Sequence, residues 1–236
     1  GPRALDVGVI QHDYARLDVK GTLAAVARLL EAQPGRLREE TAFLRGEGVD
    51  LVLADIPPAA FPAARAAGIP AVGISNFTWD WIYTDYVRRF PEYAAACEAI
   101  RADYAQAELL LRLPFHGPCD AFPVIRDIPM VARRARADRS EVCRRMGLAT
   151  DQRVVLLSFG GFDIQGLDLD QVERLEGVQF LTTQPLPRPV RNVRGVTLNG
   201  FRHVDLVAQA DAVITKPGYG IVSECLANRV PVLYTS

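Results

Sequence analysis

The feature of this 236-residue chain that most constrains its fold is a repeated unit of short apolar run, turn and amphipathic helix. Residues 51–54 form a continuous apolar run, an alanine-rich helical stretch follows at 59–67, and a second apolar run occupies 70–74. Short apolar runs separated by helices are typical of a parallel sheet covered on both faces. The same unit predicts further strands at residues 109–113, 153–159, 178–182, 196–198, 211–215 and 230–234. It predicts further helices at 19–30, 36–45 and 83–106 (interrupted at Phe90-Pro91), and helices that begin near His203 and Gly220.

A proline-rich stretch divides these units into two groups. Prolines stand at positions 114, 118, 123 and 129, close to Gly117, and such spacing is typical of a connection between domains. The sequence therefore predicts an incomplete N-terminal domain over residues 1–117, a linker over 118–137 and an incomplete C-terminal domain over 138–236. Each domain is expected to be an open α/β sheet. The arginine-rich stretch 133–145 is expected to start a helix, with Asp138 or Ser140 as its N-cap.

Composition excludes several classes of protein. The net charge is −1, so the basic surface on which nucleic-acid binding depends is absent. The apolar runs end well before the ~20 residues that a membrane-spanning helix needs, although a peripheral membrane contact stays open. The four cysteines form no C-x-x-C pair, which indicates neither a metal site nor a disulfide framework. We therefore expect free thiols in a reducing cytoplasm and neither a metal nor another cofactor. Because the chain starts at Gly1 and ends just after a predicted strand, we expect it to be part of a longer protein.

Two glycine-rich loops follow predicted strands of the second domain, where ligands of open α/β sheets bind. The first contains Gly160 and Gly161, whose backbone N–H groups could face an anion. The alternative is that this glycine pair only forms a tight turn, because such a pair is a weak motif.

The second loop is more specific. The predicted strand 211–215 runs into Lys216, then the turn Gly218-Tyr219-Gly220, then a helix that contains Glu224. A helix N-terminus offers unpaired N–H groups and partial positive charge, which suit a diphosphate. Lys216 could add a point charge, and Glu224 could accept hydrogen bonds from ribose hydroxyls. The alternatives are a solvated surface lysine and an acid that stabilises the helix start.

Two sets of residues carry a family resemblance. The stretches 206–215, 218–220, 223–227 and 230–233 resemble the C-terminal donor-binding signature of the GT-B glycosyltransferases, in the branch of the UDP-glycosyltransferases and the peptidoglycan N-acetylglucosaminyltransferase. In the first domain, residues 55–58, the turn 68–70 and above all the aromatic block 76–83 (Asn-Phe-Thr-Trp-Asp-Trp-Ile-Tyr) resemble the glycosyltransferase-like N-terminal region of plant L-arabinokinases and its stand-alone bacterial relatives.

The resemblance implies a GT-B fold, in which two Rossmann-like open parallel-sheet domains face a cleft. It implies that the glycine turn meets the donor's diphosphate, that the helix acid meets the ribose, and that the loop 200–202 frames the base. The donor-binding residues implied in this way are Gly160, Gly161, Phe162, Phe201, Lys216, Gly218, Tyr219, Gly220, Ser223 and Glu224. The residues implied on the acceptor side are Asn76, Phe77, Trp79 and Trp81, although packing between domains is an equally good explanation of the tryptophans.

Glycosyl transfer also needs a base that takes the acceptor's proton. Three residues are candidates: His12 after an expected strand, Asp55 at the end of another strand, and Asp80 within the aromatic block. Each has an ordinary alternative, since a lone histidine is most often a surface residue and an aspartate before Pro57 is a good turn residue. Family members carry an N-terminal Gly/His-rich loop that often supplies this base, and no such loop precedes Asp6.

Three functions fit these observations. The sequence favours a glycosyltransferase that moves a sugar from a nucleotide-sugar, UDP-linked, to a small-molecule or saccharide acceptor. The alternatives are a non-catalytic nucleotide-sugar-binding module related to a sugar kinase, and a GT-B sugar-nucleotide epimerase.

Overall fold

The computed structural model describes residues 5–12, 16–148, 152–159 and 168–234. Contacts between Cα atoms divide the chain into two compact units, Gly1–Met130 and Val131–Ser236. We call these the first and the second unit, and each is described by itself. Within the described residues, no helix is long and apolar enough to cross a membrane.

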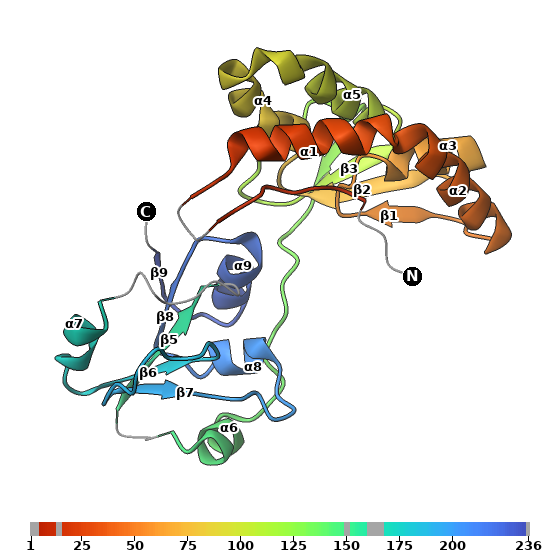
Figure 1. Cartoon of the computed structure of the whole chain (residues 1–236). Coiled ribbons are helices and arrows are strands. Elements are labelled where there is room, and N and C mark those ends of the chain that lie inside the picture. The colour runs from red at the N-terminus through yellow and green to blue at the C-terminus, as the bar shows by residue number, and fades with distance from the viewer. Residues whose placement is uncertain (1–4, 13–15, 149–151, 160–167, 235–236) are drawn as a thin grey trace. The chain divides into compact units, whose positions relative to one another are not determined.

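The first unit is built on a four-stranded parallel sheet with the order β1-β2-β3-β4. Strands β1, β2 and β3 are labelled in Figure 1. Its strands are β1 (Val52–Ala54), β2 (Ala71–Ser75), β3 (Leu109–Arg112) and β4 (Ile125–Asp127). Its helices are α1 (Val19–Glu31), α2 (Gln33–Gly46), α3 (Ala60–Ala67), α4 (Trp79–Arg89), the short 3-10 helix η1 (Pro91–Tyr93) and α5 (Ala94–Tyr104). Helix α1 contacts both α4 and α5. Gly68 ends α3 in the left-handed conformation (φ 79°), which glycine adopts without steric cost.

The second unit is built on a five-stranded parallel sheet with the order β7-β6-β5-β8-β9. Its strands are β5 (Arg153–Ser158), β6 (Val178–Thr182), β7 (Val193–Gly195), β8 (Ala212–Thr215) and β9 (Val232–Tyr234). Its helices are α6 (Arg139–Met146), α7 (Leu169–Glu173), α8 (His203–Val207) and α9 (Tyr219–Ala227). Asp138 caps α6, because its carboxylate accepts the N–H groups of Ser140 and Glu141.

The apolar character of β5 follows from burial on both faces of this sheet. Leu156 lies in a core cluster with Val142, Leu206 and Val213. Its neighbour Leu157 points to the opposite face and lies in a second cluster with Phe180. Successive side chains of a strand alternate between faces, so a strand covered on both sides needs an unbroken apolar run. The predicted α/β fold with two open parallel sheets is confirmed.

Three local predictions differ from the structure. The strand expected at 196–198 lies at Val193–Gly195, because Val193 pairs with Phe180 of β6 in register. Strand β4 lies inside the stretch expected to be a linker, because it pairs with β3 at the edge of the first sheet. The strand expected before His12 is absent from residues 5–12, since residues 5–10 have no regular structure and Gln11 forms only an isolated bridge with Leu17.

Candidate functional site

The strand order of the second unit defines where a ligand can enter. The chain runs from β5 outward through β6 to β7, then returns to the other side of β5 with β8 and β9. The strand order therefore reverses between β5 and β8, and ligands of such sheets bind at the carboxyl ends of the strands where the order reverses. Ser158 ends β5 and Thr215 ends β8, and the two residues are paired in register.

A cavity of about 500 Å³ opens at this point of the second unit. Sites for small molecules and cofactors have volumes of this order. It is bounded by the ends of β5 and β8, by the residues just after β6, by the starts of α8 and α9, and by one residue of the segment before α6. Its lining residues are Arg133, Ser158, Phe159, Thr183, Gln184, His203, Thr215, Lys216, Gly218, Gly220, Ile221 and Glu224. The structure therefore brings four of the predicted donor-binding residues together, namely Lys216, Gly218, Gly220 and Glu224.

Glu224 is the buried acid of this cavity. It lies on α9, and only 4% of its side chain is exposed. The Nε atom of Arg133 donates to Glu224 Oε1 over 2.6 Å, and a terminal nitrogen of the same guanidinium contacts that oxygen too. Glu224 Oε2 faces His203 Nδ1 at 3.6 Å. A buried carboxylate needs such partners, because an uncompensated charge in the interior is costly.

His203 connects Glu224 to the end of β5. Its Nε2 atom lies 3.2 Å from the hydroxyl oxygen of Ser158, and its Nδ1 atom faces the carboxylate. From the sequence alone His203 has no acid–base partner nearby, whereas the fold gives it two. Because one ring nitrogen can donate while the other accepts, the imidazole can hold a donor toward Glu224 and an acceptor toward Ser158.

Gly218 and Gly220 form the part of the wall where α9 begins. Neither has a positive φ, so the backbone does not demand glycine at either position. A Cβ atom added to either residue would meet no heavy atom within 4 Å. Both glycines nevertheless line the cavity, so the bare backbone at the start of the nine-residue helix α9 faces open space. The N–H groups of a helix start are suited to an anion that approaches there.

Other predicted donor-binding residues lie elsewhere. The hydroxyl of Ser223 donates to Gly220 O (2.9 Å), so it serves the helix backbone. The hydroxyl of Tyr219 is buried, and this desolvation raises its pKa. Phe201 packs on the core, and the guanidinium of Arg145 lies over its ring at 4.4 Å. None of the three lines the cavity. The predictions for Gly160, Gly161 and Phe162 fall outside the described residues.

The three candidate bases occupy different settings in the first unit. His12 is exposed and lies 4.0 Å from Asp18. Asp80 is buried, and its Oδ2 atom accepts a hydrogen bond from Arg101 (3.0 Å). Asp55 is exposed at the carboxyl end of β1, where partial desolvation and the nearby charge of Asp6 raise its pKa. A base with a raised pKa at the carboxyl edge of a sheet is well placed for proton transfer.

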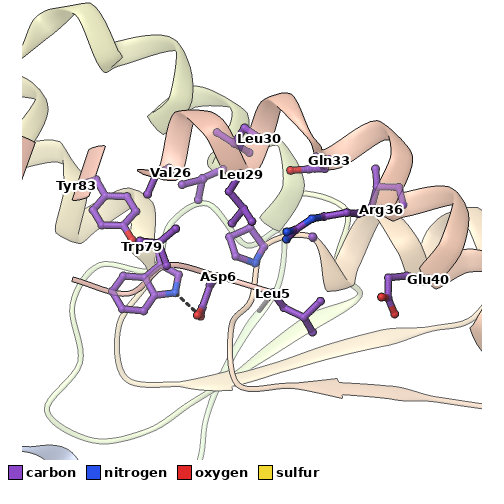
Figure 2. Close-up of a pocket in the computed structure, with 15 residues that line it drawn as sticks. Leu5, Asp6, Val26, Leu29, Leu30, Gln33, Arg36, Glu40, Trp79 and Tyr83 are labelled. Carbon is purple, nitrogen blue, oxygen red and sulfur yellow. Dashed lines mark hydrogen bonds between the residues drawn. The ribbon is translucent and has the colours of Figure 1, made fainter. Parts of the chain in front are cut away.

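Half of the aromatic block is structural. Trp79 donates from its indole nitrogen to Asp6 Oδ2 (3.1 Å) and stacks on Tyr83 with 5.5 Å between ring centroids. Figure 2 shows this pair at one end of an apolar crevice beneath α1. The crevice has a volume of about 30 Å³, which is room for water and not for a nucleotide. Phe77 packs edge-on against Trp79, and both partly buried rings pack against the core of the first unit.

The other half of the block faces outward. Trp81 is 43% exposed, and its ring lies so close to Gly117 that a Cβ there would come within 2.6 Å of it. Phe115 is 69% exposed and has a positive φ of 58°, an unfavourable conformation for a bulky residue. Asn76 holds this turn, because its side chain donates to Phe115 O (3.3 Å) and its carbonyl accepts the N–H of Gly117. Phe115 of this turn and Trp81 of α4 thus expose two aromatic rings on the first unit.

Sequence reasoning missed Arg133, His203, Thr183 and Gln184 as lining residues. No local motif marks them, although His203 opens a helix on the carboxyl side of a strand, which is where ligands of parallel sheets bind. Among the residues that the structure describes, no group of three or more His, Cys, Asp and Glu side chains could hold a metal ion.

This chain is similar to known proteins both in sequence and in fold. No family model matches the chain. The chain is 33% identical over 238 residues to L-arabinokinase from Arabidopsis thaliana, and this match covers 98% of the chain but 22% of the arabinokinase. Among solved structures, the glycotransferase of kitacinnamycin superposes with a TM-score of 0.60 at 20% identity, covering 90% of this chain and 64% of that one. UDP-glucose: anthocyanidin 3-O-glucosyltransferase in complex with UDP superposes with a TM-score of 0.59 at 13% identity, covering 87% and 62%.

These similarities establish the fold. The chain has the two-sheet architecture of the GT-B glycosyltransferases, as the donor-binding signature predicted. The likeness to L-arabinokinase predicted from residues 55–83 is confirmed as well. The chain spans less than two thirds of the length of each of these relatives.

Proposed function

We propose that this chain, whose fold is that of the GT-B glycosyltransferases, binds a UDP-linked sugar in the cavity of its second unit and transfers the sugar to an acceptor. The observation that carries the proposal is the position of Glu224, a buried carboxylate one helical turn from a bare glycine helix start. A carboxylate at that spacing accepts from ribose hydroxyls while the helix start receives the diphosphate.

Charge and shape support this assignment. Lys216 and Arg133 line the same cavity, so two positively charged side chains border the space proposed for the diphosphate. The glycines add no side chain, which lets phosphate oxygens approach the backbone N–H groups. The departing diphosphate would thus be stabilised by fixed dipoles and cations, which is the main electrostatic need of glycosyl transfer.

The acceptor is assigned to the first unit. The outward rings of Trp81 and Phe115 offer faces on which a sugar or planar acceptor can stack. Asp55 is the favoured base of the three candidates, because it is exposed and its raised pKa suits proton abstraction. We therefore expect Asp55→Asn to abolish transfer while nucleotide binding stays unchanged.

The first test is calorimetry with UDP, GDP, ADP and UDP-sugars, followed by a search for turnover. We expect binding of UDP and release of free UDP from a UDP-sugar when an acceptor is supplied. A folded protein that binds none of these nucleotides would refute the proposal. Conversion of a UDP-sugar into its epimer, followed by nuclear magnetic resonance, would replace transfer by epimerisation.

A second function is favoured by the likeness to a kinase. The chain matches L-arabinokinase over 98% of its own length, so it is also a candidate for a nucleotide-sugar-binding module without turnover. The same experiment separates the two functions, because such a module binds UDP-sugars but leaves them unchanged with every acceptor.

A further inference from the structure

The guanidinium of Arg133 is hydrogen-bonded to the carboxylate of Glu224, which the proposed function assigns to ribose. Two of its guanidinium nitrogens contact Glu224 Oε1, one of them over 2.6 Å. The lone pairs of that oxygen are therefore engaged. A ribose diol that binds to both carboxylate oxygens of Glu224 has to take over at least part of this interaction at Oε1.

The backbone of Arg133 is held in place independently of its side chain. Its carbonyl accepts a hydrogen bond from Asn228 Nδ2 (3.1 Å), and the N–H of Ala135 donates to Asn228 Oδ1 (2.9 Å). The N–H of Arg136 donates to the buried carboxylate of Asp205 (2.9 Å). These contacts fix the segment against α8 and against the C-terminal end of α9.

The side chain of Arg133, by contrast, has room to leave Glu224 and contact another group within the cavity. It is 66% exposed, whereas Glu224 beneath it is 4% exposed. Glu224 follows Gly220 by four residues, so about 6 Å along the helix axis separates the carboxylate's position from the helix start. Arg133, Gly218, Gly220 and Lys216 all line the same space. A guanidinium binds phosphate oxygens through a planar fork of donors, as it binds a carboxylate.

We propose that Arg133 is a further nucleotide-binding residue that exchanges partners, leaving Glu224 for the diphosphate when ribose binds to that carboxylate. The proposal rests on the proposed function, since it requires a nucleotide in this cavity. It follows that Arg133 opposes the binding of a nucleoside without phosphates, because such a ligand displaces the guanidinium and offers it nothing in return. It favours a nucleoside diphosphate, which supplies the new partner. Arg133 would thus select for the phosphorylated form of the ligand.

The test compares UDP with uridine on the whole chain by calorimetry. The variant is Arg133→Gln, which keeps a polar side chain and removes the charge. We expect it to weaken UDP binding about tenfold or more and to strengthen uridine binding, so that the two affinities move in opposite directions. Arg134→Gln is the matched control, since Arg134 is an exposed arginine of the same segment that does not line the cavity, and it should change neither affinity.

Arg133→Lys gives a second reading, because it keeps the charge without the planar fork. We expect it to retain part of the UDP affinity lost in Arg133→Gln. Equal weakening of UDP and uridine in Arg133→Gln would overturn the exchange and reduce Arg133 to a support for Glu224. Unchanged affinities, or uridine binding no tighter than in the wild type, would overturn it as well. Failure of the wild-type chain to bind UDP at all would instead refute the proposed function, and the exchange with it.

Discussion

Replacement of Glu224 separates a ribose-binding acid from one that only supports its helix. In Glu224→Ala both carboxylate oxygens are lost, whereas Glu224→Gln keeps the shape and one carbonyl oxygen. Hydrogen bonds to a charged group contribute about 1.5–3 kcal/mol each, and ~1.4 kcal/mol corresponds to one decade of affinity. We therefore expect Glu224→Ala to weaken UDP binding by about tenfold to a hundredfold, with Glu224→Gln between it and the wild type.

The structure predicts a small effect on stability. Removing one partner of a fully buried ion pair costs roughly 3–5 kcal/mol, because the other charge is stranded. Here the other charge belongs to Arg133, whose side chain is 66% exposed and can be hydrated in place. The loss should therefore be about 1 kcal/mol, or a decrease in Tm of roughly 4–8 °C for a unit of this size.

The assay is calorimetry below the melting temperature, with thermal denaturation of each variant alongside. Glu176→Ala serves as the control, since Glu176 is an exposed glutamate of the same unit outside the cavity. UDP lacking both ribose hydroxyls should bind Glu224→Ala at least as tightly as the wild type, because Arg133 no longer has to leave a carboxylate to meet the diphosphate. The reasoning fails if Glu224→Ala lowers Tm and binds UDP as tightly as the wild type, because the acid would then serve only the helix.

Three further substitutions have definite expected outcomes. Gly220→Ala should raise the free energy of unfolding by up to ~1 kcal/mol, because alanine favours a helix over glycine and its Cβ would contact no other atom here. The same methyl group enters the cavity and should weaken UDP binding in calorimetry. Unchanged binding would contradict this. Gly117→Ala should destabilise the chain by about 1–3 kcal/mol in denaturant titrations, because its Cβ collides with the ring of Trp81. Adding Trp81→Ala removes the ring and should recover most of this loss of stability. If stability is not recovered, the collision is not the cause. Arg202 and backbone N–H groups hold the pKa of Asp205 well below its usual 3.8, so its contribution to stability is complete above that pH and is lost as the pH falls below it. Asp205→Asn should therefore cost ~2 kcal/mol at neutral pH and flatten the acid branch of the stability curve, and an unchanged acid branch would contradict this.

Features that depend on neighbouring residues could be predicted from the sequence. The unbroken apolar run of β5 predicts a strand buried on both faces, and Leu156 and Leu157 do point to opposite clusters. The strand 178–182 was predicted with the bounds that the structure has, and Asp138 is one of two predicted caps. The turn from β8 into α9, with Lys216, Gly218, Gly220 and Glu224, was also predicted. Such features need only local periodicity and turn chemistry.

Features that depend on contacts between distant segments were decided by the tertiary structure. The bounds of β7 follow from its register with β6. Strand β4 forms because it pairs with β3, although the four nearby prolines predict a linker from the local sequence. His203 acquires Ser158 and Glu224 as partners only when the strand order brings the ends of β5 and the starts of α8 and α9 together. Arg133 reaches Glu224 across 91 positions of sequence. A chain encodes its local conformations in residues a few positions apart, whereas packing alone determines which side chains from distant segments share one cavity.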